Sequence, residues 1–387
     1  MLISGILLTL GLSCLGLYNV NNNDRLIVEN DKSNNRVVSS NALTMMYEIE
    51  AGSGEYQVAS DTTWPQEGYV FNAELSRCEN GSTLTWDDEN NRVIMEANTS
   101  DKCYVYFDMV LPPTLVEYIT TEVYTGTDGD NGLYYHDGSG TYTNADQEAG
   151  DNSYKYSGAN PNNYVCFGSD EETCPNDNLY RIIGVFDGQV KLIKLTLFGS
   201  FAWNSEVNNE WNPEKNIYPN IKNYLNVDYY NTLDMEWQNL ISNHEWNVGG
   251  LEYNYAYSGP VKITYTYEVH NSNNKIMDIM KIGLIYISDY GYGFSSEYWN
   301  IKHWENGVNC EYNWLYPADT EVSSDWLWTP SKNADNNSEV FYIINGRVGN
   351  DNAPITRRNN VYPCFYLKSD VIYVSGSGTQ TDPLRIA

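Results

Sequence analysis

The chain has 387 residues and a formal net charge of −29. This length allows two or three domains, each able to bury its own core, and an aromatic content of 14% excludes a disordered acidic chain. The negative charge argues against a nucleic-acid partner, because phosphate binding requires a basic face. The chain is rich in Asn and has 34 Tyr, two residue types that recognition surfaces use.

The N-terminal segment, residues 1–20, contains no charged side chain. Its length fits either a cleaved signal peptide or an uncleaved membrane anchor, and it is the only part expected to meet a membrane. Residues 21–42 are rich in Asn, Asp and Ser without hydrophobic periodicity, which predicts a flexible stalk. The rest of the chain is therefore expected outside the cell, at the cell surface.

A small all-β domain is expected over residues 43–111. Its predicted strands are short segments of alternating or apolar residues at 45–49, 69–71, 83–86, 92–96 and 103–107. The sequence Leu111-Pro112-Pro113 ends this domain, because proline cannot donate to a strand ladder. Residues 112–163 mix Gly, Asp, Asn and Tyr, and predict a loop-rich connection.

A larger domain is expected over residues 164–387, which makes the fold class α+β. Asp187-Gly188 between two apolar segments predicts a hairpin. Apolar residues at steps of three and four over 221–241 predict one or two amphipathic helices. Strict alternation over 261–270 predicts a half-buried strand, and the apolar run 281–288 predicts a central strand.

The cysteines predict a disulfide framework, because six remain when Cys14 is set aside and all lie in turn-rich sequence. Their spacing suggests three pairs, Cys78–Cys103, Cys166–Cys174 and Cys310–Cys364. Loop closure would contribute about 3.5, 2.5 and 4 kcal/mol respectively in the chain-entropy model. Zinc is the competing interpretation, but the sequence has neither a Cys-x-x-Cys pair nor a His cluster. No metal and no cofactor are therefore expected.

Catalytic motifs are few. His244-Glu245 matches the start of a zinc-protease helix, but Val248 stands where the second His is required. Neither a Gly-x-Ser-x-Gly elbow nor a phosphate-binding loop is present. The acidic residues between 319 and 325 lie beside Trp326, an arrangement that a glycosidase could use. We expect a protein that is not an enzyme, with a secreted glycan-active enzyme as one alternative.

The C-terminal part carries the features of a binding surface. Five tryptophans lie between residues 299 and 328, and the polar segment 345–360 holds three arginines in an Arg-poor chain. Trp and Arg dominate binding hot spots, and polar loops on a rigid sheet often carry recognition. The predicted ligand-binding residues are Trp326, Trp328, Asn345, Arg347, Arg357 and Arg358. We expect adhesin-like binding of an extracellular glycan or protein, with a structural or pilus-like assembly subunit as the other alternative.

Several strings of the sequence resemble motifs of exported surface proteins of gut Firmicutes. They are Tyr164–Ser169, Asn178–Phe186, Trp246–Gly250, Lys281–Gly293, Asn313–Tyr316, Trp328–Pro330 and the segment that follows Tyr366. Cys103–Asp108 resembles the end of a small domain that often stands upstream, so the resemblance covers most of residues 43–387.

The C-terminal part resembles a C-type-lectin-like domain of the sulfatase-modifying-factor type. This resemblance implies early helices, a mixed twisted sheet and long loops on one side. It does not imply sugar binding, because the calcium-lectin signatures Glu-Pro-Asn, Gln-Pro-Asp and Trp-Asn-Asp are absent. No cysteine pair is placed for formylglycine generation, and Tyr362-Pro363 stands where similar sequences have Val-Arg-Pro. A fold resemblance alone does not define a function.

Overall fold

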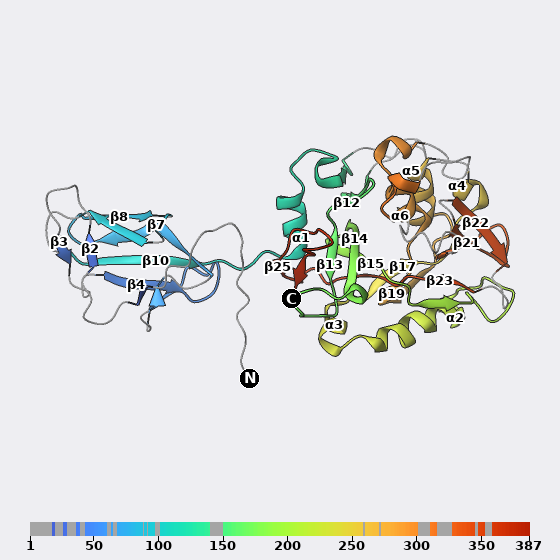
Figure 1. Ribbon diagram of the computed structural model, residues 1–387, viewed down its shortest axis with the longest axis horizontal. Coiled ribbons are helices and arrows are strands. Elements are labelled where there is room, and N and C mark those ends of the chain that lie inside the picture. The colour runs from blue at the N-terminus through green and yellow to red at the C-terminus, as the bar shows by residue number, and fades with distance from the viewer. Residues whose placement is uncertain are drawn as a thin grey trace. The chain divides into compact units, whose positions relative to one another are not determined.

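A computed structural model describes most of the chain. The described residues are 18–19, 26–28, 36–38, 43–59, 63–64, 68–87, 89–90, 92–96, 101–139, 150–257, 260–270, 272–300, 310–315, 327–344, 347–352 and 358–387. The chain divides into two compact units, Met1–Pro112 and Pro113–Ala387 (Figure 1). The division falls in the proline-rich break at 111–113. With about 22% helix and 39% strand in several small sheets, the structure is mixed, compatible with the predicted α+β class.

The elements described in the smaller unit are all strands. They are β1 (Tyr18–Asn19), β2 (Leu26–Val28), β3 (Arg36–Val38), β4 (Leu43–Glu48), β5 (Tyr56–Val58), β6 (Thr63–Trp64), β7 (Tyr69–Cys78), β8 (Thr83–Asp87), β9 (Arg92–Glu96) and β10 (Cys103–Met109). The main sheet has the order β5-β4-β10-β7, with β10 parallel to β4 and antiparallel to β7. The β8–β9 hairpin contributes Trp86, which packs against Phe71 and Phe107 with ring centroids 5.9 Å apart in both cases. The core of this unit is therefore aromatic.

The segment predicted as a stalk contains regular structure. Within residues 21–42, β2 and β3 pair as an antiparallel hairpin. A short ladder therefore stands within the segment predicted as a flexible stalk. The two strands are the apolar triplet Leu26–Val28 and the triplet Arg36–Val38, and both are too short to give a periodicity that stands out from the surrounding polar residues.

The larger unit is built on a seven-stranded and a five-stranded sheet. The first has the order β11-β12-β14-β15-β24-β19, with β13 also pairing β14, and the second has the order β16-β23-β20-β21-β22. The strands are β11 (Leu133–His136), β12 (Ser153–Tyr156), β13 (Tyr164–Cys166), β14 (Leu179–Phe186), β15 (Gln189–Lys194), β16 (Gly199–Phe201), β17 (His244–Asn247), β18 (Met277–Met280), β19 (Ile282–Gly283), β20 (Leu327–Lys332), β21 (Glu339–Ile344), β22 (Arg347–Asn352), β23 (Asn359–Val361), β24 (Cys364–Tyr366), β25 (Tyr373–Ser375) and β26 (Arg385–Ile386).

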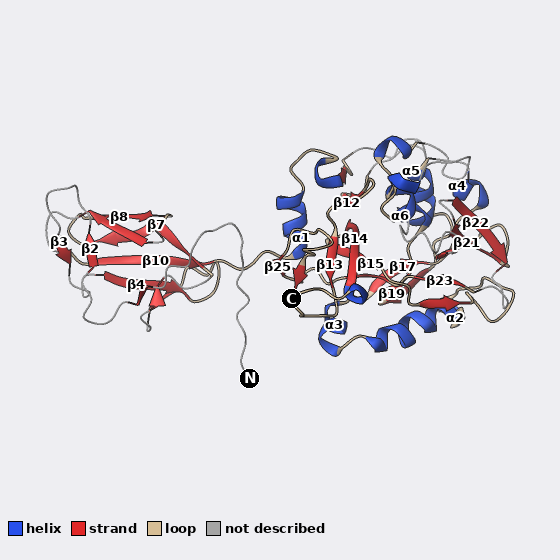
Figure 2. Ribbon diagram, viewed as in Figure 1, coloured by secondary structure: helices blue, strands red, loops and turns tan. Residues whose placement is uncertain are grey.

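Short helices flank these sheets. They are α1 (Leu115–Glu117), α2 (Asn220–Asn223), α3 (Met235–Leu240), α4 (Tyr253–Tyr257), α5 (Val261–Tyr265) and α6 (Ile287–Tyr292), with π-helical turns at Tyr118–Val123, Tyr224–Tyr229 and Thr266–His270. Figure 2 shows α2 and α3 on one side of the strands and α5 and α6 on the opposite side. Between them lies a large aromatic core in which Trp203, Trp211, Trp246 and Trp328 are fully buried.

The expected loop-rich connection over 112–163 is instead part of the larger unit. Thr114 and Glu117 form a capping box at the start of α1, and Leu115 is buried. Further along, β11 pairs β12, which pairs β14, so this segment extends the main sheet. The strands were missed because their buried positions include Tyr156 and Lys155, whereas pattern analysis looks for aliphatic residues.

Two local predictions are confirmed. β14 and β15 form the expected hairpin around Asp187 and Gly188, whose φ angles of 48° and 71° are those of a type I′ turn. The segment 221–241 is mainly helical, with α2, the π-helical turn, a 3₁₀ turn at Tyr230–Thr232 and α3 in succession, and it buries most of the apolar face that the periodicity predicted.

The strand predicted over 261–270 is wrong, because this segment forms α5 and a π-helical turn. Alternating residues also include the positions i, i+4 and i+8, and Val261, Tyr265 and Val269 use that spacing to pack on Tyr292 and Trp299. Pro260 at the N-cap begins the helix. Likewise, the run 281–288 is only partly a strand, because β19 ends at Gly283 and α6 begins at Ile287.

Candidate functional site

The predicted binding face does not form around Trp328. This side chain is fully buried, and its indole Nε1 donates a hydrogen bond to the carbonyl of Phe201, 2.8 Å away. The prediction for Trp328 is therefore wrong, because the large apolar surface that makes Trp a good contact residue serves the core here. Trp326, Asn345 and Arg357 lie outside the described residues, as do the acidic positions 319–325.

The other two predicted residues, Arg347 and Arg358, are exposed. Arg347 begins β22, and Arg358 immediately precedes β23. The register places both at the same end of the five-stranded sheet, but β21 and β20 lie between their strands. Three strand spacings separate their backbones by roughly 14 Å. The described residues thus place the two arginines on one sheet end without bringing them together.

The cysteine predictions are met for two pairs. Cys78 bonds Cys103, and Cys166 bonds Cys174. Cys364 is a free, fully buried thiol in β24, so the predicted bond to Cys310 is not formed. Burial raises the pKa of the Cys364 thiol far above its ordinary value. The prediction failed because spacing along the chain does not show that Cys364 belongs to a core strand.

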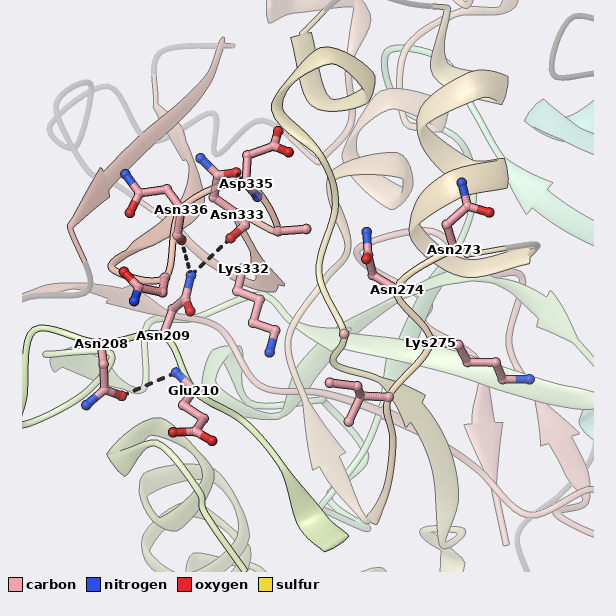
Figure 3. A pocket seen from close by; sticks show the side chains of 14 residues that line it. Asn208, Asn209, Glu210, Asn273, Asn274, Lys275, Lys332, Asn333, Asp335 and Asn336 are labelled. Atoms are coloured by element: carbon pink, nitrogen blue, oxygen red, sulfur yellow. Dashed lines mark hydrogen bonds between the residues drawn. The ribbon is translucent and has the colours of Figure 1, made fainter. Parts of the chain in front are cut away.

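A polar groove in the larger unit offers a different candidate site. Its volume is about 790 Å³, within the range usual for ligand sites. The lining residues are Asn208, Asn209, Glu210, Gly249, Asn273, Asn274, Lys275, Ile276, Lys332, Asn333, Ala334, Asp335, Asn336 and Asn337. Figure 3 shows Asn208, Asn209 and Glu210 on one side and Asn273, Asn274 and Lys275 on the other.

Two adjacent glycines let the walls of the groove approach each other. A Cβ atom at Gly249 would lie 1.3 Å from the carbonyl oxygen of Asn274, and one at Gly250 would lie 2.3 Å from that of Lys332. Gly250 also has a φ of +88°, a conformation that favours glycine. The loop after β17 therefore touches the loop before β18 on one side and the end of β20 on the other.

Asn209 holds the third wall in place. Its side-chain Nδ2 donates to the carbonyl oxygens of Asn333, Asn336 and Glu339 at 3.1, 2.7 and 2.6 Å. Its backbone N–H donates to the carbonyl of Asn337. This buried amide ties the segment before α2 to the turn between β20 and β21, so Asn209 builds the groove and does not offer its amide to a ligand.

Other polar groups of the groove remain available. Within the described part of the chain, the carboxamides of Asn273, Asn274 and Asn337 have no hydrogen-bond partner. The same holds for the ammonium groups of Lys275 and Lys332. Burial lowers the pKa of Lys332 below its ordinary value, and the charge of Glu210 opposes this shift. The groove thus presents donors and acceptors whose hydrogen bonds are not used by the described fold.

The lining residues are mainly amides, with two carboxylates and two ammonium groups among them. The charged groups are Glu210, Asp335, Lys275 and Lys332. The Asp335 carboxylate accepts a hydrogen bond from the backbone N–H of Tyr253 at 2.8 Å. Glu210 lies 3.9 Å from the ammonium of Lys215. This set can form hydrogen bonds and ion pairs with a polar ligand.

The groove was not predicted from the sequence, although its three walls share one sequence feature. Three Asn-Asn pairs, at 208–209, 273–274 and 336–337, each supply one wall. The pairs are separated by more than sixty positions each, and Asn is common throughout the chain, so nothing in the sequence shows that these three converge.

Comparison with family models, curated proteins and solved structures finds no match to this chain. Among the helices that the structure describes, none is both long and apolar enough to cross a bilayer. The groove and the polar groups of its walls are therefore the features of the molecule that bear on its function.

Proposed function

We propose that this chain is a non-enzymatic, exported cell-surface protein whose larger unit binds an extracellular glycan in the asparagine-lined groove. The observation that carries the proposal is the set of carboxamides without partners among the described residues, gathered around a space of about 790 Å³. Each sugar hydroxyl is both a donor and an acceptor. A carboxamide matches it, because the same side chain offers an oxygen acceptor and an N–H₂ donor.

The net charge of the chain narrows the classes of glycan that we expect it to bind. A net charge of −29 repels polyanions at long range, which favours a neutral glycan over a highly sulfated or polyphosphate chain. Lys332 and Lys275 on the groove then serve as donors to hydroxyl or carbonyl oxygens. The two disulfides are compatible with export, because such bonds persist mainly in oxidising compartments.

The proposal is tested by applying the labelled protein to an array of neutral, amino-substituted and acidic glycans, with extended peptides printed beside them. We expect binding to a restricted group of neutral glycans that is insensitive to moderate salt. Binding to peptides alone would make the groove a protein-recognition site. Retention on no glycan, with the protein shown to be folded, would contradict the proposal. Release of free sugar from a retained glycan would assign an enzymatic function instead.

A further inference from the structure

A lysine and an aspartate from distant parts of the larger unit meet in its core. Lys191 lies on the central strand β15, and Asp289 lies in the first turn of α6. The Nζ atom of Lys191 is 2.5 Å from Oδ2 of Asp289, and the side chains are 1% and 5% exposed. This contact joins the sheet to a helix that is 98 positions further along the chain.

Aromatic rings enclose the lysine ammonium. The rings of Tyr286, Trp246, Tyr366 and Phe186 have their centroids 4.6, 5.2, 5.3 and 5.7 Å from Nζ. An ammonium group can donate three hydrogen bonds, yet among the described residues Asp289 is its only acceptor. The remaining N–H groups face rings, so water and alternative acceptors are kept from this pair.

A second pair in the same unit provides a contrast. Lys222 and Asp278 are 2.6 Å apart, but the Lys222 side chain is 20% exposed. Its ammonium donates to both carboxylate oxygens, and Asp278 also accepts from the indole of Trp211. The Lys191 ammonium, by contrast, is shielded from solvent and donates to a single oxygen of Asp289.

We propose that Lys191 and Asp289 condense into an intramolecular amide bond. One ammonium proton passes to the carboxylate, which leaves a neutral amine and a carboxylic acid. The amine nitrogen attacks Cγ of Asp289, the C–O bond to the hydroxyl group breaks, and the hydroxyl leaves as water with a second proton from nitrogen. The ammonium and carboxylate therefore become one amide and one water molecule, and no oxidant or reductant is required.

The enclosure affects this reaction in two ways. Reacting groups that are held in contact behave as if at effective concentrations of roughly 10⁵–10⁸ M, which offsets the unfavourable condensation of separate molecules. Burial also makes each charge costly, which disfavours the ammonium, although Asp289 and the other groups near the ammonium together outweigh burial and raise the pKa of Lys191. The amide oxygen can keep the hydrogen bond that Asp289 accepts from the backbone N–H of Tyr286 at 2.8 Å.

The product would be a covalent cross-link between the sheet and α6. It is independent of the proposed glycan binding, because neither residue lines the groove. A tie of this kind suits an exposed surface protein, since it resists both mechanical unfolding and proteolysis of the loops between the joined elements.

Tandem mass spectrometry of a tryptic digest of the reduced full chain tests the proposal. Trypsin does not cleave after an acylated lysine, so we expect no cleavage at Lys191. The peptide that contains it should be joined to the peptide that contains Asp289, with a mass about 18 Da below their sum. Lys222 is the internal control and should be cleaved normally. Separate peptides with cleavage at Lys191 would overturn the proposal.

A conservative variant tests whether the mass deficit arises at another position in the chain. Lys191→Arg retains the positive charge but cannot form this amide under these conditions. The joined peptide and the mass deficit should both disappear, while Lys222→Arg should leave both unchanged. If the deficit of about 18 Da persists in Lys191→Arg, the link is not made by Lys191 and the assignment is wrong. Should Lys191→Arg not fold, the wild-type digest alone decides the question.

Discussion

His136 shows how a single buried ring makes stability depend on pH. It lies in β11, and its Nε2 atom is buried with no hydrogen-bond partner among the described residues. Tyr292 and Trp299 pack against the ring, with centroids 5.0 and 5.6 Å away. Burial, and then the positive charge of Lys155, lower the pKa of His136 well below its ordinary value, although Asp151 opposes the shift.

The lowered pKa of His136 determines how stability changes with pH. The unfolded chain binds the proton near pH 6.5, while the folded chain resists it, so the stabilisation is complete above about pH 6.5 and is lost as the pH falls. The loss is about 1.4 kcal/mol per pH unit for each such histidine until its folded pKa is reached. His244 acts in the same direction, since its pKa is lowered to about 4, chiefly by burial.

His136→Phe tests this account, because it removes the titrating group without removing a described hydrogen bond. We expect the free energy of unfolding of the variant to fall less steeply between pH 6.5 and 5 than that of the wild type. Chemical denaturation at several pH values measures it. Parallel pH profiles for the two proteins would show that His136 does not take up a proton on unfolding.

Residue type alone did not distinguish core from surface in this chain. Trp328 was expected in a binding face and lies in the core, whereas the groove is lined mainly by asparagines that carried no special signal. Both residue types serve either role, because Trp supplies apolar area and Asn supplies hydrogen bonds wherever the fold places them.

Gly249 is the position in the groove where a side chain would clash most severely with a neighbouring loop. Gly249→Ala would place Cβ 1.3 Å from the Asn274 carbonyl oxygen, so the loop before β18 must move. We expect a destabilisation of about 1–3 kcal/mol, as for other overpacking substitutions, together with loss of glycan binding. Denaturant unfolding and a binding assay measure the two effects. Unchanged stability would show that the loops are not in this close contact.

Elements whose apolar residues repeat with one clear period could be predicted from the sequence. Segments whose pattern fits both the strand and the helix period could not. The type I′ hairpin and the helices over 221–241 follow from local signals. The segment 261–270 fits both a strand and a helix, and its contacts with α6 decide in favour of the helix. Such contacts, like the convergence of the three groove walls, join residues far apart in the chain and are not visible in any local window.

At the scale of the molecule, the two units have separate cores and separate disulfides. Cys78 and Cys103 join paired strands of the smaller unit, whereas Cys166–Cys174 lies in the larger one. Replacing both members of the first pair by Ser should cost about 3.5 kcal/mol in that unit, and about 2.5 kcal/mol for the second pair in the other. Calorimetry should show one transition shifted by each double variant. A single transition that both shift equally would contradict independent folding.

Localising the ligand to the asparagine groove tests the central claim most directly. Calorimetric titration of the exported protein with its best array glycan should compare the wild type with Asn274→Ala/Asn337→Ala. Asn176→Ala, an exposed asparagine outside the groove, is the matched control. Two lost hydrogen bonds at about 1 kcal/mol each predict an affinity roughly 30-fold weaker for the double variant and unchanged for the control. Equal affinity in all three proteins would place the ligand elsewhere and contradict the account.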